Sequence, residues 1–289
     1  MKNKLIINSL LEYLDKSKKN MSSYGLTHID KSDYQNIFTP MNSGTFIKKN
    51  ILKNVLYKFL QRKIWGINLF KNTFYKNYKK ICDEQNRLID VNLIWHIYIL
   101  KILDKYDLLK DNICVIGDGK ANFISGCLML KKNIKLFSVN LPQALIQDYL
   151  VINNSKLLND KFIKVVNNKE DLKDENIKLF LIPAENKSLL KNHKINLFTN
   201  TACFQEIPKS ETKEYFEIIK SNDAYLYCCN REEKPMYDGS INRFNDYPFD
   251  NHNKIFYEKC NFAKHYYTLR PPFVRDYPPF LHCLINYKS

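Results

Sequence analysis

The stretch Ile113-Cys-Val-Ile-Gly-Asp-Gly-Lys-Ala-Asn-Phe123 decides the fold. Four apolar residues run directly into Gly117-Asp118-Gly119, and a helix-compatible segment follows. Such a pattern is typical of a buried strand, a tight turn and a helix N-terminus. Glycine lets the backbone approach a ligand closely, and the helix N-terminus offers free N–H groups. We therefore expect a nucleotide-type cofactor over Gly117 and Gly119, with a purely structural turn as the alternative.

Segments of two kinds alternate along the chain after Asp107. Apolar, strand-like runs are followed by helix-like segments, which predicts parallel βαβ units with right-handed crossovers. The last two strand-like runs have no full helix between them, so they could close the sheet with an antiparallel edge. The sequence therefore predicts an α/β fold with a Rossmann-like, mostly parallel sheet and an antiparallel C-terminal edge strand. We expect strands at 113–117, 134–140, 178–183, 195–201, 224–229, 266–269 and 281–287, a strand or loop at 162–166, and helices at 121–132, 142–158 and 209–221.

The N-terminal part of the chain has a helical pattern. We expect an amphipathic helix within residues 1–20, a polar, turn-rich segment at 21–44, and helices from 45 to 107, where apolar residues recur at intervals of three and four. This helical spacing of apolar residues differs from the alternation of strand-like and helix-like segments that follows it. We therefore expect residues 1–108 to form a helical cap, a substrate wall or a dimerisation surface, and residues 109–289 to form the cofactor-binding domain.

The net charge of +15 raises the possibility of a nucleic-acid partner. Only six of the 45 basic residues are arginines, and the lysines are scattered rather than clustered with aromatic residues. Nucleic-acid binders more often show clustered arginines. We therefore do not expect nucleic acid as the main partner, although an anionic sugar derivative would suit a basic surface.

Neither a membrane span nor a metal site is expected. No run of about 18 apolar residues is present, and the N-terminal apolar run is too short for a signal peptide, so we expect a cytoplasmic protein. The eight cysteines are scattered without a Cys-x-x-Cys pair, and the histidines have no ligand spacing. These cysteines are best interpreted as reduced, buried thiols.

The glycine turn narrows the choice of cofactor. The dinucleotide fingerprint requires a third glycine where Asn122 stands, and the acidic residue expected after the second strand is replaced by Asn140. An NAD-dependent oxidoreductase is therefore disfavoured. A Gly-x-Gly turn followed by the small Ala121, with a polar residue ending the next strand, favours the S-adenosylmethionine pocket of a class I methyltransferase. Asn140 can hydrogen-bond ribose hydroxyls through its side-chain oxygen.

Three segments resemble the sugar O-methyltransferase family. Residues 138–150 resemble its Asp-Leu-Pro-Glu … Gln-x-Tyr-Leu segment, residues 197–207 its Asn-x-x-Ser-x-Gln-Glu-Met segment, and residues 225–231 its Tyr-x-Tyr-x-x-Asn-Arg segment. The resemblance covers roughly residues 110–235. It implies S-adenosylmethionine as cofactor and a sugar or glycan as acceptor, in surface polysaccharide or nucleotide-sugar modification. The cofactor-binding residues that we expect are Gly117, Asp118, Gly119, Asn140, Leu141, Glu185, Asn200 and Thr201.

The sequence departs from this family at several positions. Val115 stands where methyltransferases usually carry an acidic residue, Asn140 replaces an aspartate, and Cys203 and Ile207 replace serine and methionine. The missing acids normally anchor the methionine amino group and the ribose. Asp118 is a candidate to replace one of them. A methyltransferase-like protein without catalytic activity is one alternative, and a nucleic-acid methyltransferase is another.

Candidate catalytic residues follow the fourth and fifth predicted strands of this domain. Transfer to a hydroxyl requires a group that takes its proton. We predict Glu206 as base or acceptor anchor, Gln205 as the residue that orients the sugar, and Asn230 and Arg231 as further substrate contacts. Arg231 could hold a phosphate or carboxylate. His265 is the second candidate base. The alternatives are a structural carboxylate at a helix N-terminus for Glu206 and a surface side chain for Arg231.

Overall fold

The computed structural model describes residues 2–20, 50–130, 133–158, 162–236, 239–249, 253–268 and 271–288. The polar segment expected at 21–44 lies outside these residues. The N-terminal helices are α1 (Lys2–Asn20), α3 (Ile51–Trp65), α4 (Asn68–Lys71), α5 (Thr73–Glu84) and α6 (Val91–Lys105). The alternating part contains β1 (Asp111–Ile116), α7 (Asn122–Leu128), β2 (Ile134–Asn140), α8 (Pro142–Asn153), β3 (Ile163–Val165), η1 (Lys169–Lys173), β4 (Leu179–Pro183), η2 (Ala184–Leu190), β5 (Leu197–Thr201), η3 (Phe204–Glu206), α9 (Lys209–Lys220) and β6 (Tyr225–Arg231).

The C-terminal part is made mainly of strands. They are β7 (Glu233–Pro235), β8 (Ile241–Arg243), β9 (Lys254–Lys259), β10 (His265–Tyr267), β11 (Val274–Asp276) and β12 (Phe280–Asn286), with the short helices η4 (Phe244–Asp246) and η5 (Asn261–Ala263) between them.

The described strands form an eight-stranded sheet in the order β3-β4-β2-β1-β5-β6-β12-β9. The strands from β3 to β6 pair in parallel, whereas β12 runs antiparallel to both β6 and β9. The expected Rossmann-like sheet, mostly parallel with antiparallel pairing at its C-terminal edge, is confirmed. Because these strands are parallel, their carboxyl ends lie at one edge of the sheet. The chain crosses from β4 on one side of β1 to β5 on the other, and ligands bind at the carboxyl edge beside such a crossover.

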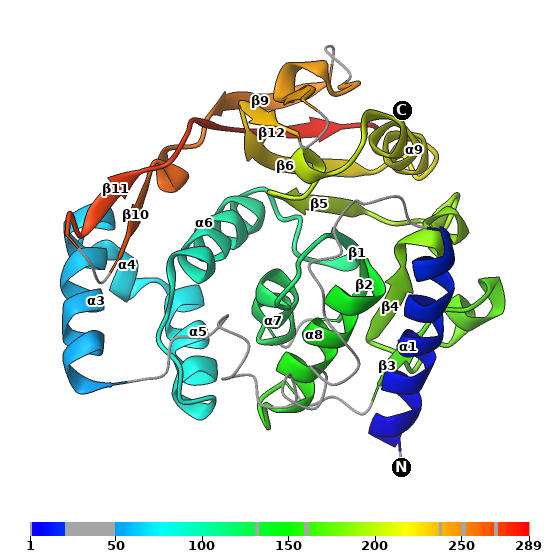
Figure 1. The fold of residues 1–289 in the computed structure, drawn as a ribbon, viewed down its shortest axis with the longest axis horizontal. Coiled ribbons are helices and arrows are strands. Elements are labelled where there is room, and N and C mark those ends of the chain that lie inside the picture. The colour runs from blue at the N-terminus through cyan, green and yellow to red at the C-terminus, as the bar shows by residue number, and fades with distance from the viewer. Residues whose placement is uncertain are drawn as a thin grey trace.

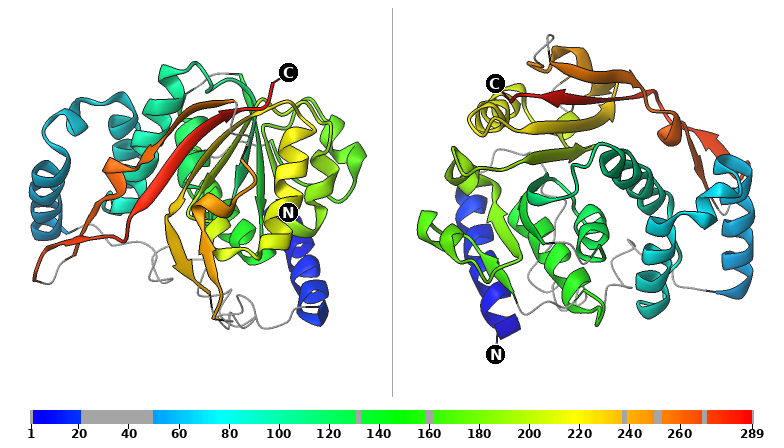
Figure 2. Two further views of the ribbon diagram at one scale, coloured as in Figure 1. Left: turned by 90° about the horizontal axis from the view of Figure 1, so that it is seen from above. Right: turned by 180° about the vertical axis from the view of Figure 1, so that it is seen from behind.

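Both faces of the sheet are buried. Successive side chains of a strand point to opposite faces, so alternate residues of β1 belong to two different cores. Ile113 and Val115 of β1 join a core with α6, α7 and α8, whereas Cys114 and Ile116 join a second core with α9. Figures 1 and 2 show these helices on opposite faces of the sheet. Two buried faces explain why the strands have continuous apolar sequences.

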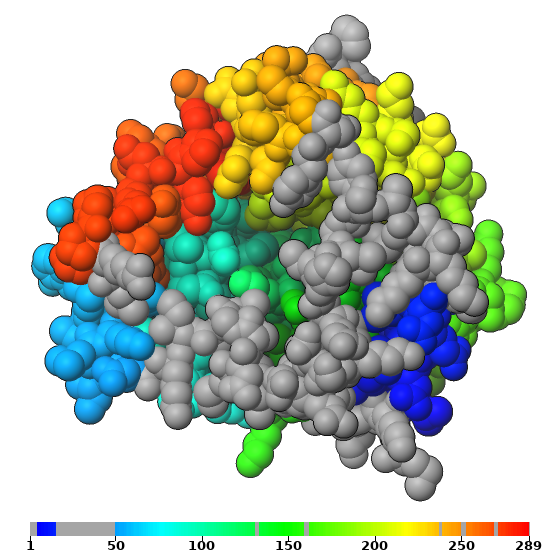
Figure 3. All heavy atoms as spheres, in the orientation of Figure 1, coloured from blue at the N-terminus to red at the C-terminus, as the bar shows by residue number. Residues whose placement is uncertain are grey.

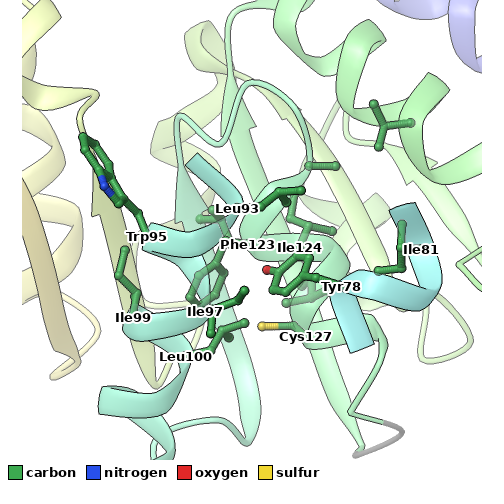
Figure 4. Close-up of a cluster of buried hydrophobic side chains, with 14 of the residues drawn as sticks. Tyr78, Ile81, Leu93, Trp95, Ile97, Ile99, Leu100, Phe123, Ile124 and Cys127 are labelled. Carbon is green, nitrogen blue, oxygen red and sulfur yellow. The ribbon is translucent and has the colours of Figure 1, made fainter. Parts of the chain in front are cut away.

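The first of these cores extends into the helices before β1. In Figure 4, Tyr78 of α5, Leu100 of α6 and Phe123 of α7 point toward one another. The Tyr78 hydroxyl donates to the Asn122 carbonyl at 2.5 Å, and all three side chains are at most 1% exposed. Helix α1 packs elsewhere, against α8 and β3. Residues on both sides of position 108 thus share one core, and a domain boundary there stays a prediction.

The C-terminal strands differ in part from expectation. The strand predicted at 281–287 is β12, but the one predicted at 266–269 is β10, which pairs with β11 in a separate hairpin. The edge position belongs instead to β9. Its sequence, Lys-Ile-Phe-Tyr-Glu-Lys, is mostly exposed, so it lacks the apolar run that marks the buried strands. Over the described residues, none of the helices combines the length and the apolar character needed to cross a bilayer.

Candidate active site

The glycine turn joins β1 to α7 at the shared edge. Both glycines have positive φ, +76° at Gly117 and +68° at Gly119. A Cβ at Gly117 would lie 2.2 Å from the Cys203 sulfur, so close packing against the segment after β5 requires glycine there. Among the described residues, nothing lies within 4 Å of a Cβ built at Gly119. With respect to these residues the Gly119 backbone is open to a ligand, as a ligand-binding turn requires.

Asp118 lies between the two glycines but points into the protein. Its side chain is fully buried and accepts hydrogen bonds from the backbone N–H groups of Phe123 at 3.0 Å and Ile124 at 2.9 Å. Burial raises the pKa of Asp118, and His96 and these backbone N–H groups oppose the rise. In this structure Asp118 therefore fixes the start of α7. Its predicted contact with a cofactor stays a prediction.

Asp148 of α8 was not expected from the sequence. Its Oδ1 accepts from the Ala121 N–H at 2.6 Å, and its Oδ2 is 3.4 Å from the Ser138 hydroxyl. The Asn140 side chain also hydrogen-bonds to it. The carboxylate thereby ties α8 to the end of β2 and to the glycine turn. Burial and the nearby Asp118 raise the pKa of Asp148 well above the usual range. One acidic residue within the apolar helix sequence 142–153 was the available signal.

Trp95 and His96 of α6 were also missed. His96 Nε2 lies 4.0 Å from Asp118 Oδ1, and burial lowers the pKa of His96. Both side chains are more than nine-tenths buried, yet Trp95 Nε1 and His96 Nδ1 have no hydrogen-bond partner in the described part of the chain. These residues come from a helix packed across the sheet, so no strand-end motif points to them.

Residues at the ends of β5 and β6 form a buried amide network. Asn200 Oδ1 accepts from the Asn230 side chain at 2.8 Å and from the Phe204 N–H at 3.1 Å. Asn230 Oδ1 accepts from the Gln205 N–H, and Gln205 Oε1 accepts from the Arg231 N–H at 2.8 Å. The structure thus brings Asn200, Gln205, Asn230 and Arg231 together. Through these bonds they shape the segment that carries Glu206.

Glu206 lies at the end of this network, about half exposed. Its Oε1 accepts from Gln205 Nε2 at 3.2 Å and lies 3.1 Å from Lys234 Nζ. One neighbour is therefore an amide fixed by the network and the other a cation on β7. This arrangement holds a carboxylate at the strand edge while leaving part of it accessible to an acceptor.

The remaining predicted cofactor contacts follow neighbouring strands. Asn140 ends β2, and its Oδ1 accepts from the Leu141 N–H at 2.9 Å. Glu185 lies in η2, directly after β4, and Thr201 ends β5. Because Asn140 pairs with Pro183, and Ile116 pairs with Val139 and Asn200, these positions meet at the edge that holds the glycine turn.

Tyr277 lies near Arg231 and packs against two further aromatic rings. The ring centroid of Tyr277 lies 5.0 Å from that of Trp95 and 4.4 Å from that of Tyr266. Burial raises the pKa of Tyr277, and Arg231 is near enough to oppose the rise. Arg231 Nε is buried without a hydrogen-bond partner in the described residues. We call Trp95, Tyr266 and Tyr277 the aromatic wall.

His265 lies next to this wall, on β10. Its Nδ1 is 2.5 Å from Asp276 Oδ1, and its side chain is about one-third exposed. It belongs to the separate hairpin rather than to the main sheet, so it is not held at the strand edge with Glu206. Its role as a second base stays a prediction. Among the described residues, no three His, Cys, Asp or Glu side chains gather as metal ligands.

Solved structures of methyltransferases resemble part of this chain at low identity. An S-adenosylmethionine-dependent methyltransferase from Aquifex aeolicus is 13% identical, covering 64% of this chain and 88% of its own, with a TM-score of 0.38. Magnesium protoporphyrin IX methyltransferase from Synechocystis PCC 6803, with S-adenosylmethionine bound, is 10% identical over 81% of this chain and 96% of its own, with a TM-score of 0.37. An arsenic(III) methyltransferase from Chlamydomonas reinhardtii is 9% identical over 62% and 63% of the two chains, with a TM-score of 0.34.

No family model and no curated protein matches the chain. Two of these methyltransferases act on different compounds, magnesium protoporphyrin IX and arsenic(III), as their names state. Similarity of this extent says nothing about what this chain binds. The function must therefore be argued from the chain's own strand edge.

Proposed function

We propose that this protein is an S-adenosylmethionine-dependent O-methyltransferase that acts on a sugar hydroxyl. The proposal rests on three groups that lie at the carboxyl edge of the main sheet. There a glycine turn that opens at Gly119 lies on the same edge as a half-exposed carboxylate, Glu206, and a cation, Arg231. The three segments that resemble sugar O-methyltransferases supply the choice of cofactor and acceptor.

The residues of the turn fit the proposed cofactor in part. Open space at Gly119 suits a ligand that lies against the backbone, and Asn140, Leu141 and Glu185 follow the adjacent strands. Asp118 and Asp148 do not supply an exposed carboxylate, because both are buried and bonded to backbone N–H groups. Backbone and neutral polar groups would therefore provide most of the binding.

When bound, S-adenosylmethionine supplies a methyl group that is activated by a positively charged sulfur. Transfer of that methyl group to an acceptor oxygen would break the carbon–sulfur bond, leave neutral S-adenosylhomocysteine and require the hydroxyl to lose its proton. Glu206 takes the proton, and Gln205 and Lys234 hold its carboxylate in place. Arg231 binds a phosphate or carboxylate carried by the sugar, and the aromatic wall packs against the apolar face of the ring.

Measured turnover tests the role of Glu206. We expect Glu206→Gln to lower methyl transfer from labelled S-adenosylmethionine to a sugar acceptor by about 10²–10⁴-fold, because the amide cannot accept the proton. Binding of S-adenosylhomocysteine should be unchanged.

The matched control is Lys234→Met. It removes one of the two groups that hold the Glu206 carboxylate but leaves the base itself, so it should lower turnover far less than Glu206→Gln does. Full activity of Glu206→Gln on every acceptor that the wild type methylates would remove Glu206 from its role.

A further inference from the structure

Helix α3 has an apolar side that faces away from the protein. Ile51, Leu52, Val55 and Phe59 are between 63% and 83% exposed. At 100° per residue these four side chains lie within one angular sector of about 100°. We call them the outer stripe. Exposed apolar side chains are common singly, but four on one helical face mark an interaction surface.

The opposite side of α3 is already packed. Tyr57, Leu60 and Gln61 are buried, and Gln61 Nε2 donates to the Ile89 carbonyl at 2.9 Å and to the Tyr267 hydroxyl at 2.8 Å. Trp65 Nε1 donates to the Phe262 carbonyl at 3.1 Å. These bonds fix which face points outward, so the outer stripe is not available to the protein's own core.

The charges on α3 are all positive. Lys53, Lys58, Arg62 and Lys63 are exposed, and the helix contains no acidic residue. None of the four forms an ion pair with a carboxylate in the part of the chain that the structure describes. By the same count of 100° per residue, Lys58 and Lys63 flank the outer stripe and Arg62 lies within it, whereas Lys53 lies on the other side of the helix.

We propose that the outer stripe of α3 binds an anionic membrane surface, with α3 lying in the plane of the interface. An apolar face with Lys and Arg beside it is the composition of interfacial helices, whose apolar side chains enter the lipid while the cations contact acidic headgroups. A second copy of this chain fits less well, because two such faces would bring six cations together with no acid from either helix. The net charge of +15 adds to the attraction.

This surface is linked to the candidate active site through the C-terminal hairpin. Tyr267 of β10 packs against Tyr57 of α3 with ring centroids 4.7 Å apart, and the adjacent Tyr266 belongs to the aromatic wall. In Figure 3, α3, in light blue, forms a corner of the molecule beside this hairpin, in orange and red. Because the hairpin packs on the side of α3 opposite the outer stripe, membrane binding by α3 would place it across the helix from the lipid, about 10 Å from the lipid-facing side chains.

Vesicle cosedimentation tests the proposal on the full chain. We expect binding to vesicles that contain phosphatidylglycerol, little binding to pure phosphatidylcholine, and weaker binding as salt rises from about 0.05 to about 0.5 M. The double variant Leu52→Gln, Phe59→Gln should bind at least about tenfold more weakly, because it removes two side chains that would enter the lipid. Its S-adenosylhomocysteine binding and circular dichroism should match the wild type.

The matched control is Leu157→Gln, Phe162→Gln, which replaces one leucine and one phenylalanine that are also exposed but lie far from α3 in the sequence. It should bind vesicles like the wild type. The proposal is overturned if the wild type does not bind, if it binds both vesicle types equally, or if both double variants lose binding alike. A dimer that dissociates only in the α3 variant, without vesicle binding, would assign the stripe to a second copy instead.

Discussion

Asp148 is a buried carboxylate whose hydrogen bonds reach the glycine turn and the end of β2. It accepts from Ala121 and contacts Ser138 and Asn140. Asp118, whose charge acts on it, fixes the first N–H groups of α7 in the same way. The shape of the turn therefore rests on two acids that do not face a ligand. Because both pKa values are raised on folding, the contribution of these two acids to the free energy of unfolding depends on pH.

The pH dependence of stability tests this role of Asp148. With a raised pKa, the folded protein keeps a proton at pH values where the unfolded chain, with a carboxyl pKa of about 3.9, has lost it. The folded state then binds more protons, so the free energy of unfolding falls as pH rises from about 4 toward the raised value. Asp148→Asn lacks this titration.

We expect the wild type to lose stability relative to Asp148→Asn across that window, by about 1.4 kcal/mol for each pH unit over which the two states differ by one proton. Urea unfolding at a series of pH values measures the difference. Parallel stability curves for the two proteins would show that the Asp148 pKa is not raised on folding.

At the scale of elements, the contact between α7 and the helices before β1 is unusually close. A Cβ at Gly126 of α7 would lie 2.3 Å from Leu100 Cδ1 and 2.4 Å from the Tyr78 hydroxyl oxygen. Tyr78 cannot move freely, because that hydroxyl donates to the Asn122 carbonyl. The glycine therefore sets the distance at which α5 and α6 pack on α7, and with it the position of His96 beside Asp118.

We expect Gly126→Ala to lower the free energy of unfolding by about 1–3 kcal/mol through overpacking. Alanine is the better helix former by about 1 kcal/mol, so propensity alone predicts the opposite sign. Thermal or urea unfolding decides between them. In a double-mutant cycle, Tyr78→Phe should recover part of the loss, since it removes the oxygen that the new Cβ would meet. A more stable Gly126→Ala would contradict the packing account.

Strands that are buried on both faces could be predicted from the sequence, whereas the exposed edge strand β9 and the pairing of β10 could not. Strands β1, β2, β4, β5 and β6 are apolar runs, so their positions, their parallel arrangement and the glycine turn could be predicted from pattern, whereas the segment of β3 was open between strand and loop. Strand β9 is exposed and charged, and the partner of β10 depends on tertiary packing that has no local signal. The site divides in the same way. Positions at or after strand ends, such as Glu206 and Arg231, have a sequence signal, and their roles stay predictions. His96 and Asp148 reach the turn from packed helices, and Trp95 contacts Tyr277 from α6, so no strand-end pattern indicates them.

At the scale of the whole molecule, the C-terminal half of the sheet and the N-terminal helices both contribute residues to the proposed acceptor side. Strand β6 contributes Arg231, the segment before β12 contributes Tyr277, and α6 contributes Trp95. Residues on both sides of position 108 thus contribute to the proposed acceptor side. The cytoplasmic location, the possible homodimer and the sugar acceptor stay predictions, and methyl transfer to any acceptor requires that the glycine turn bind S-adenosylmethionine.

Calorimetric titration with S-adenosylhomocysteine tests that claim most directly. We predict one site on the wild type, and binding at least about tenfold weaker in Gly119→Arg, whose side chain would fill the open space at the turn. Gly119→Ala carries the same cost of positive φ but adds one carbon, so it should weaken binding less. NADH should not bind. Absence of S-adenosylhomocysteine binding by the folded wild type, or binding of NADH in its place, would contradict the account.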